Sequence, residues 1–479
     1  MIIVMAESQT LQSNYDENSQ ILDCVLRVKE SFDIVARRIM IADKRASIYF
    51  VDGFVKDDIM EKIMEFIMSL KPEDFASLDT AEKVSAKFIT YVEVDTSSDT
   101  AAITRSVLSG MVGLLIEGYN GVILIDSRTY PARSIEEPDS DHVLRGAHDG
   151  FVETLVFNTA LIRRRIRDPR LTMEIFTIGS VSQSDVVLCY MEGEADPKLV
   201  DKLRRQLKEI RIPTLTMGQE SLMECLVKRQ WYNPFPKVRY TERPESACAG
   251  VVEGQILIIT DNTPAVMVLP TAIFDFTQDA NDYYFPPLVG GYLRLIRMMI
   301  VISTLFLTPI WVAFLQNPDT IPMWLDFIRI QEPNKIPIIV QLLLIEVMID
   351  GLKLASLNTP NSLSSVFGLV GALVLGEFAV TARLFVPEVL LYMAFVAASS
   401  FTQPSYELGY AFKLFRMFLL ILTAAFSWWG LVGGVIFVFI IIATTRTVGQ
   451  TSYLAPLIPF NWKALKRLFI RRALHPHNC

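Results

Sequence analysis

Cysteine and histidine are scarce in this chain of 479 residues, which holds five cysteines and four histidines. The cysteines stand far apart and form no CxxC pair; they are Cys24, Cys189, Cys225, Cys248 and Cys479. Such spacing favours free thiols in a reducing compartment over disulfides or a zinc site. We therefore expect no bound metal and no cofactor.

Motifs of common enzymes are also missing. The sequence contains no HExxH, no phosphate-cradling GxxxxGK[ST] and no GxSxG, which argues against a zinc protease, a P-loop nucleotide hydrolase and a serine hydrolase. His142 stands near Asp141, Asp149 and Glu153, but this polar stretch is more simply interpreted as a hydrated linker than as a metal site. We predict that the protein is not an enzyme.

Basic side chains are too few in the first 289 residues to form a nucleic-acid surface. This part holds 31 basic and 44 acidic residues, whereas residues 290–479 hold 14 basic and 8 acidic ones. Phosphate binding needs clustered cations, so we expect no nucleic-acid partner. The first residues also lack the basic n-region of a secretory signal, and we expect the N-terminal part to stay in the cytoplasm.

Long apolar runs fill the last third of the chain. About 20 apolar residues cross a bilayer as a helix, and their backbone polar groups must be satisfied inside that helix. The sequence therefore predicts an all-α polytopic membrane domain with the lipid bilayer as a partner. The runs cover residues 293–315, 336–357, 362–380, 386–401 and 411–444.

The number of crossings follows from the positive charges at the two ends of this domain. Arg294 and Arg297 flank the first run, and the tail after residue 460 is basic. Because positive residues collect on the cytoplasmic side, both termini are expected there, which requires an even number of crossings. Five runs then leave two alternatives, four crossings with one re-entrant run or six with a turn at residues 428–434 in the last run.

The region before the membrane domain predicts two small α/β subdomains. Residues 118–121 read Gly-Tyr-Asn-Gly between two apolar strands, which is a strong hairpin signal. A similar hairpin closes the second half near residues 256–269, and weakly indicates a duplicated unit. A helix is expected at residues 18–42, where apolar residues recur on one helical face.

These patterns give a division of the whole chain. We predict a disordered N-terminus at 1–20, one cytosolic α/β subdomain at 21–145, and a linker helix with a second α/β subdomain at 146–280. A transmembrane domain of four to six crossings follows at 281–450, and a basic cytosolic tail at 451–479.

Ionisable residues inside the apolar runs are candidate functional residues, because charge is costly in lipid. Glu346 and Asp350 lie four residues apart, on one face of the second run. One interpretation is an acidic stripe that selects cations along a pore. The alternative is internal pairing of Asp350 with Lys353, a residue that can reach the interface.

A polar break between two runs extends this candidate ion path. Asn358, Asn361 and Ser362 form an irregular stretch, and Glu377 stands inside a neighbouring run. Non-helical backbone at membrane depth is tolerated where it lines a cavity or is buried in protein. Glu377 is equally explained by a hydrogen bond to a neighbouring helix.

A basic run ends the predicted linker helix. It consists of Arg163, Arg164, Arg165 and Arg167. The simpler interpretation is a solvated face that pairs with the preceding acidic stretch, and the more specific one is a docking surface for a neighbouring subunit.

Three stretches resemble the A subunits of GerA-type spore germination receptors. They are residues 131–171, 358–380 and 399–416, beginning PARSIEEPDSDHVLRGAHDGF, NTPNSLSSVFGLVGALVLGEF and SSFTQPSYELGY. The resemblance covers most of the chain, from about residue 18 to about residue 468. It implies a multi-pass protein of the spore inner membrane with cytoplasmic termini, two cytosolic α/β subdomains and a C-terminal membrane domain.

The resemblance also implies a function. It implies a homo-oligomer, with a pentamer expected, that forms a channel for monovalent cations during germination, beside a transporter-like membrane subunit and a lipoprotein. The pore would map onto Glu346, Asp350 and the break after Asn358. Alternatives are a component of dipicolinate release, which would need convergent cations, and a non-conducting scaffold of the receptor complex. The cations in the apolar runs lie near their ends, which counts against dipicolinate release.

Overall fold

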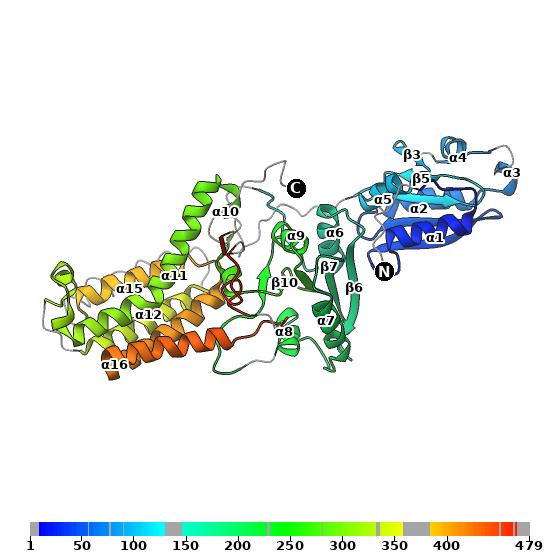
Figure 1. Ribbon diagram of the computed structural model, residues 1–479. Coiled ribbons are helices and arrows are strands. Elements are labelled where there is room, and N and C mark those ends of the chain that lie inside the picture. Colours follow the sequence, from blue (N-terminus) through cyan, green and yellow to red (C-terminus); the bar gives the residue numbers. More distant parts are fainter. Residues whose placement is uncertain are drawn as a thin grey trace. The chain divides into compact units, whose positions relative to one another are not determined.

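The chain folds into two compact units, shown in the computed structural model of Figure 1. The N-terminal unit comprises residues 1–228 and 238–270, and the C-terminal unit comprises residues 229–237 and 271–479. Residues 229–237 thus leave one unit in sequence and pack in the other. The structure describes residues 9–55, 57–75, 78–89, 91–129, 146–227, 230–279, 281–331, 336–357, 384–449, 452–462 and 465–466.

The first half of the N-terminal unit is a five-stranded antiparallel sheet covered by helices on both faces. Its strand order is β1-β2-β4-β5-β3, with β1 Ile34–Ile41, β2 Lys44–Val51, β4 Val112–Ile116, β5 Val122–Ile125 and β3 Val94–Ser97. The covering helices are α1 Tyr15–Leu26, α2 Asp57–Met68, α3 Pro72–Phe75, α4 Ala81–Phe88 and α5 Thr100–Leu108.

Alternation along β4 explains these two layers. Leu114 packs with residues of α2 and α4, whereas Leu115 packs with residues of α1 and α5. Because neighbouring residues of a strand point to opposite faces, both faces of this strand must be covered by apolar elements. All five residues of β4 are buried.

The second half of the N-terminal unit repeats the same strand order. Its antiparallel sheet runs β6-β7-β9-β10-β8, with β6 Leu171–Ile178, β7 Ser184–Met191, β9 Ile256–Thr260, β10 Val266–Leu269 and β8 Arg239–Thr241. The helices of this half are α6 Leu155–Arg165, α7 Pro197–Glu209, α8 Gln219–Leu226 and α9 Pro244–Val252. The matching orders support the duplication that the two closing hairpins indicated.

Helix α6 joins the cores of the two halves. Leu161 and Ile162 pack in the core of the second sheet, while Ala160 packs in the core beneath α1 and α5. Gly53, with φ +80°, lies against the same helix, since a Cβ there would meet Val156 Cγ1 at 3.0 Å and Ala160 Cβ at 3.2 Å. Glycine permits both this backbone angle and this close approach.

Two expectations for the N-terminus are corrected. The expected helix at 18–42 ends at Leu26, and its second half is strand β1, because the chain reverses after Ile41 and pairs with β2 over eight residues. The disorder expected at residues 1–20 is also wrong from residue 9 onward within the described part. Leu11 is buried there, and α1 begins at Tyr15 behind the capping side chain of Asn14.

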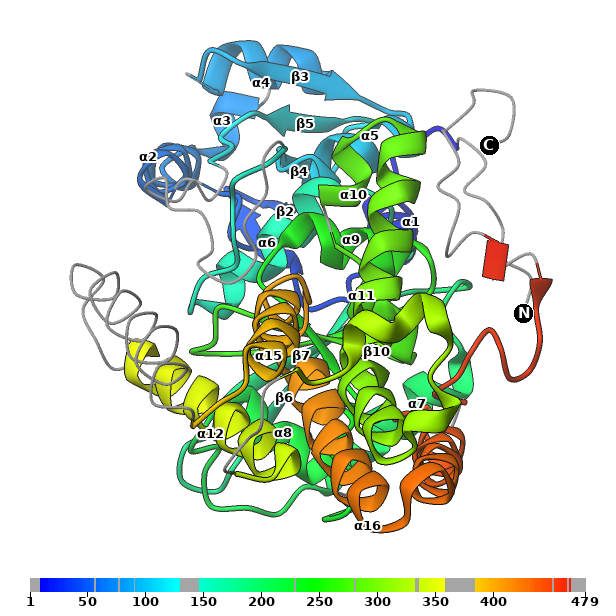
Figure 2. The ribbon, with the colours of Figure 1, turned by 90° about the vertical axis from the view of Figure 1, so that its left-hand side faces the viewer.

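The C-terminal unit is helical in its described residues (Figures 1 and 2). Two of these helices are long and apolar enough to cross a membrane, α11 Pro287–Gln316 and α16 Tyr406–Thr444. The other elements are η1 Ile273–Thr277, α10 Asn281–Tyr284, η2 Pro318–Thr320, η3 Met323–Ile328, α12 Ile338–Leu357 and α15 Pro387–Ser400. The fold class is therefore a two-part α/β region followed by a helical region, as the sequence predicted.

The long helix α16 is a hairpin of two helices. Ser427 has the non-helical angles φ 54° and ψ −136°, and the rings of Phe418 and Phe437 lie 5.2 Å apart. A straight helix, at about 1.5 Å per residue, would separate those rings by roughly 28 Å. Gly434 lies against Leu419 of the first half, so the absence of a side chain lets residues 428–444 pack against residues 406–426.

Candidate functional site

A cluster of five charged side chains lies among the helices of the C-terminal unit. Glu346 of α12 is 1% exposed, and its Oε1 lies 2.5 Å from a guanidinium nitrogen of Arg416 on α16. Lys413 Nζ lies 3.2 Å from Glu346 Oε2 and 2.5 Å from Asp350 Oδ1. The cluster thus joins α12 to the first half of α16. We call Glu346, Asp350, Lys353, Lys413 and Arg416 the charged cluster.

Helical spacing brings these groups together. Glu346 and Asp350, four residues apart, share one face of α12, and Lys413 and Arg416, three apart, share one face of α16. Arg416 Nη1 also donates to the backbone oxygen of Thr304, 3.1 Å away on α11. Arg416 therefore links three helices through one guanidinium.

Lys353 contacts a fourth helix. Its ammonium donates to Ser400 Oγ of α15 at 2.9 Å and lies 5.3 Å from the ring centre of Phe401. The structure therefore pairs Asp350 with Lys413 on another helix, where the sequence offered Lys353 three residues along the same helix.

The charges of the cluster do not cancel. Two carboxylates face three cationic side chains, which leaves a net charge of +1. Buried ions are costly, and a pair repays its desolvation only when further hydrogen bonds complete it. Such a network among apolar helices is a candidate functional site, because a core of apolar side chains would hold the helices together at less cost.

A small cavity adjoins the charged cluster. Its volume is about 40 Å³, and its lining includes Glu346, Arg416, Ser400, Tyr406 and Tyr410. This volume accommodates about one water molecule. A hydrated ion is larger than this cavity.

The structure does not describe the remaining candidate residues of the ion path. Asn358, Asn361, Ser362 and Glu377 lie outside the described residues. Among the described residues, no group of three or more His, Cys, Asp or Glu side chains gathers as a metal site.

The basic run of α6 divides between the interior and the surface. Arg163 is fully buried, with its Nε 2.7 Å from Asp33 Oδ2. It also donates to Ser31 Oγ and to the backbone oxygens of Asp168 and Leu171. A neighbouring subunit cannot reach a buried side chain, so the docking role expected of Arg163 is corrected to a structural one.

The other three arginines reach the surface. Arg165 pairs with Asp149 at 2.6 Å and is half-buried. Arg167 is exposed, with Nη1 3.4 Å from Ser109 Oγ, and Arg164 is exposed as well. Arg164 and Arg167 are therefore the members of the run that a partner can reach.

Sequence reasoning missed the cationic half of the charged cluster. Lys413 and Arg416 are among the cations that lie near the ends of the apolar runs, and nothing in the sequence ties them to Glu346, which lies 70 residues before Arg416. Their spacing of three residues at the start of that run was the available signal, since it puts both cations on one helical face.

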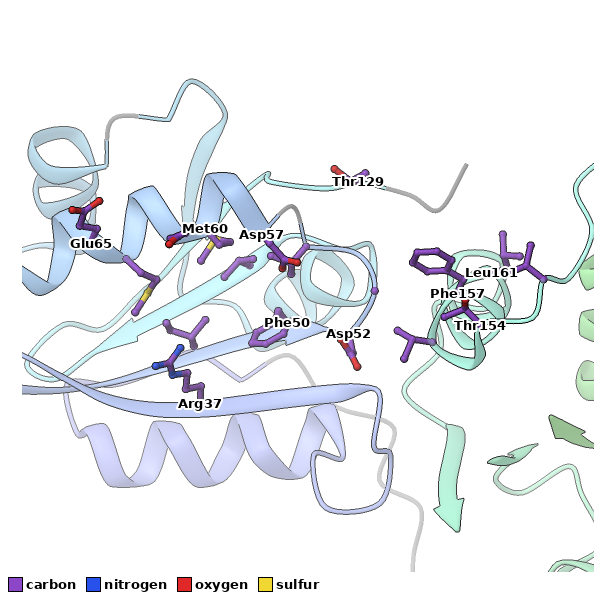
Figure 3. Close-up of a pocket in the computed structure, with 18 of the residues that line it drawn as sticks. Arg37, Phe50, Asp52, Asp57, Met60, Glu65, Thr129, Thr154, Phe157 and Leu161 are labelled. Carbon is purple, nitrogen blue, oxygen red and sulfur yellow. The ribbon is translucent and has the colours of Figure 1, made fainter. Parts of the chain in front are cut away.

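A large cavity lies in the N-terminal unit, between the first sheet, α2 and α6 (Figure 3). Its volume is about 1290 Å³. Phe50 of β2, Met60 of α2 and Phe157 of α6 supply apolar surface, while Asp57 and Glu65 add negative charge. Arg37 also lines the cavity, so its wall carries charges of both signs. It was not predictable, because its walls come from three distant segments.

Comparisons with known proteins place the chain in a family. The model of the family described as Bacillus/Clostridium GerA spore germination protein matches residues 24–478. The chain is 40% identical to stage V sporulation protein AF of Bacillus subtilis (strain 168), over 92% of this chain and 89% of that protein. It is 29% identical to spore germination protein A1 of the same organism, over 90% of this chain and 87% of that protein.

One solved structure is also similar. It is the crystal structure of the N-terminal domain of the A subunit of the Bacillus megaterium spore germinant receptor GerK3, with 26% identity and a TM-score of 0.42. The match covers 55% of this chain and 96% of that one.

The resemblance predicted from the sequence is confirmed. Residues 31–39, 68–75 and 283–297, which read SFDIVARRI, MSLKPEDF and YYFPPLVGGYLRLIR, also predict the likeness to stage V sporulation protein AF, and the identity of 40% confirms it. The chain therefore belongs to the GerA family of spore germination proteins.

Proposed function

We propose that this chain is a membrane subunit of a spore germination complex and forms a homo-oligomeric channel for monovalent cations. The relatives are spore germination proteins by name, which supports the role in germination and a location in the spore inner membrane beside other germination subunits. The charged cluster among apolar helices carries the channel assignment, because ionisable groups at such positions mark ion paths.

Six crossings are the proposed topology. The sequence holds five apolar runs, and the hairpin in α16 divides the last of them into two. Six is even, so both termini lie on the cytoplasmic side, as the positive charges at the two ends require. The turn at Ser427 then faces the opposite side of the membrane.

The closed state is held by the charged cluster. Glu346 and Asp350 are neutralised by Lys413 and Arg416, and the adjoining cavity holds about one water molecule. Opening separates α12 from α16 and releases the carboxylates to water and passing cations.

Oligomer contacts involve the N-terminal unit in this proposal. Arg164 and Arg167 are exposed at the end of α6 and suit acidic groups on a neighbouring copy. A pentamer is the number that the family resemblance implied.

Potassium efflux from proteoliposomes tests the proposal. Wild-type protein is compared with Glu346→Gln and Asp350→Asn, each of which raises the cluster charge from +1 to +2. Asp326→Asn is the matched control, because Asp326 is an exposed carboxylate of the same unit that pairs with Arg329 outside the cluster. We expect potassium efflux from the two cluster variants to differ from that of the wild type, because each variant removes a carboxylate of the path and an ion pair that joins α12 to α16. Efflux from the control should equal that of the wild type.

Two outcomes contradict the proposal. Equal flux in all four proteins removes the charged cluster from the ion path. The absence of flux from wild-type protein whose assembly is verified favours the alternative of a non-conducting scaffold.

A second candidate is release of an anion such as dipicolinate. The sequence argues against it because the cations lie near the ends of the apolar runs, but Lys353, Lys413 and Arg416 line one cavity. Convergent cations at membrane depth are what an anionic substrate requires. Liposomes loaded with dipicolinate distinguish the two functions, since an anion path releases dipicolinate and is weakened by Lys413→Gln, whereas a cation path releases none.

A further inference from the structure

Residues 230–237 form an aromatic loop that is fixed to the rest of the C-terminal unit. Asn233 Nδ2 donates to Thr445 Oγ1 at 2.7 Å. The ring of Phe235, 3% exposed, stacks on Phe415 at 5.1 Å and lies 6.0 Å from the ring of Tyr453. The base of the loop is therefore held by buried contacts.

The tip of this loop is exposed. Trp231 is 97% exposed and Tyr232 is 51% exposed, with their rings 6.0 Å apart and edge to face. Burying a large aromatic side chain contributes a sizeable fraction of the free energy of unfolding of a small domain, so such side chains are seldom left in water. Exposed aromatic side chains on a loop whose base is fixed indicate a surface that binds a partner or a membrane.

A second exposed aromatic segment starts from the same base. Tyr453, which packs against Phe235, is fully buried. Further along, Phe460 and Trp462 are mostly exposed and their rings stack at 6.3 Å. We call Trp231, Tyr232, Phe460 and Trp462 the aromatic collar.

The position of the base of the loop, at the end of α16, indicates what contacts the aromatic collar. Thr445, which accepts the hydrogen bond from Asn233, is the C-terminal cap of α16, the last apolar helix described. The end of a membrane helix lies where hydrocarbon gives way to lipid headgroups, and Trp and Tyr are enriched at that level.

Charge supports a lipid occupant. Lys228 and Arg229 precede Trp231 in the sequence, and Lys463 follows Trp462. Basic residues beside interfacial aromatics are suited to the phosphates of anionic lipids.

We propose that the aromatic collar inserts into the headgroup region of the bilayer, at the cytoplasmic end of α16. The loop then attaches the chain of the N-terminal unit to the membrane at a point 50 residues before the first apolar helix. The inference rests on the membrane location in the proposed function but not on ion conduction, so either one can fail without the other.

Fluorescence quenching in nanodiscs of phosphatidylcholine and phosphatidylglycerol tests the insertion. The chain has six tryptophans, and five are changed to Phe to leave Trp231. Bromine is placed on the acyl chains either near the headgroup or near the chain end. The control is Val92→Trp in the chain without other tryptophans, because Val92 is 95% exposed before β3 of the first sheet.

We expect Trp231 to be quenched more by bromine near the headgroup than by bromine near the chain end, and the control to be unquenched. Red-shifted, unquenched emission from Trp231 would show a side chain in water and overturn the proposal. Blue-shifted, unquenched emission would show a protein surface over the collar, such as a second copy, and would also overturn it.

The same readout is available in the native background. The bromine quenching of tryptophan fluorescence is measured in the wild type and in Trp231→Phe, and the difference gives the contribution of Trp231. A single conservative substitution at an exposed site leaves the fold intact. A zero difference, with potassium efflux retained, refutes the collar while leaving the channel standing.

Discussion

Replacing Asp33 by alanine removes the carboxylate that pairs with the buried guanidinium of Arg163. Both side chains are almost completely buried, and their closest atoms lie 2.7 Å apart. Asp33 precedes β1 of the first sheet, whereas Arg163 belongs to α6, which packs in the core of the second. The substitution leaves a buried charge without its partner at the junction of the two halves.

The magnitude follows from this burial. Breaking one side of a buried ion pair costs about 3–5 kcal/mol. In native-state hydrogen exchange, lowering the free energy of local opening by this amount raises the exchange rate roughly 10²- to 5 × 10³-fold. We expect that increase in peptides of β1, α6 and β6 in the full-length protein, measured by mass spectrometry.

Two further variants make this prediction specific. Arg165 lies on the same helix as Arg163 and forms a partly exposed ion pair with Asp149. Arg165→Met breaks that pair, which is worth about 0–1 kcal/mol. The double variant Asp33→Ala with Arg163→Met removes both charges and should recover part of the lost protection. Exchange in Asp33→Ala that equals exchange in Arg165→Met would refute the reasoning.

Two other predictions concern the N-terminal unit. Burial raises the pKa of the Cys189 thiol, and it raises the pKa of the Cys248 thiol to about 12. An aromatic disulfide reagent should therefore modify the exposed Cys24 and Cys225 rapidly, and Cys189 and Cys248 only after denaturation. Equal modification rates for these four thiols would contradict the prediction. Gly53→Ala forces a left-handed residue against α6 and should destabilise the unit by about 2 kcal/mol or more, measured by the same hydrogen exchange, while an unchanged value would show that α6 can move away.

Local sequence patterns predicted much of the fold. The apolar runs predicted the helical C-terminal unit, and the Gly-Tyr-Asn-Gly turn predicted the hairpin of β4 and β5. A turn at residues 428–434 of the last run was one of two alternatives, and the structure has the non-helical residue just before that stretch, at Ser427. Each of these features depends on residues that are close in sequence.

Features that depend on distant residues were not predictable in the same way. Asp33 and Arg163 are 130 residues apart, and Glu346 and Arg416 are 70 apart, so periodicity carries no sign of either pair. Strand β1 was mistaken for helix because its apolar residues continue the helical spacing of α1, and short apolar runs fit both periods.

The central claim is tested most directly by the reversal potential of purified protein in a planar bilayer between unequal KCl concentrations. The account predicts a reversal potential near the equilibrium potential of potassium, which moves toward zero in Glu346→Gln and Asp350→Asn and stays unchanged in Asp326→Asn. A reversal potential near that of chloride would contradict the account and assign the charged cluster to an anion path.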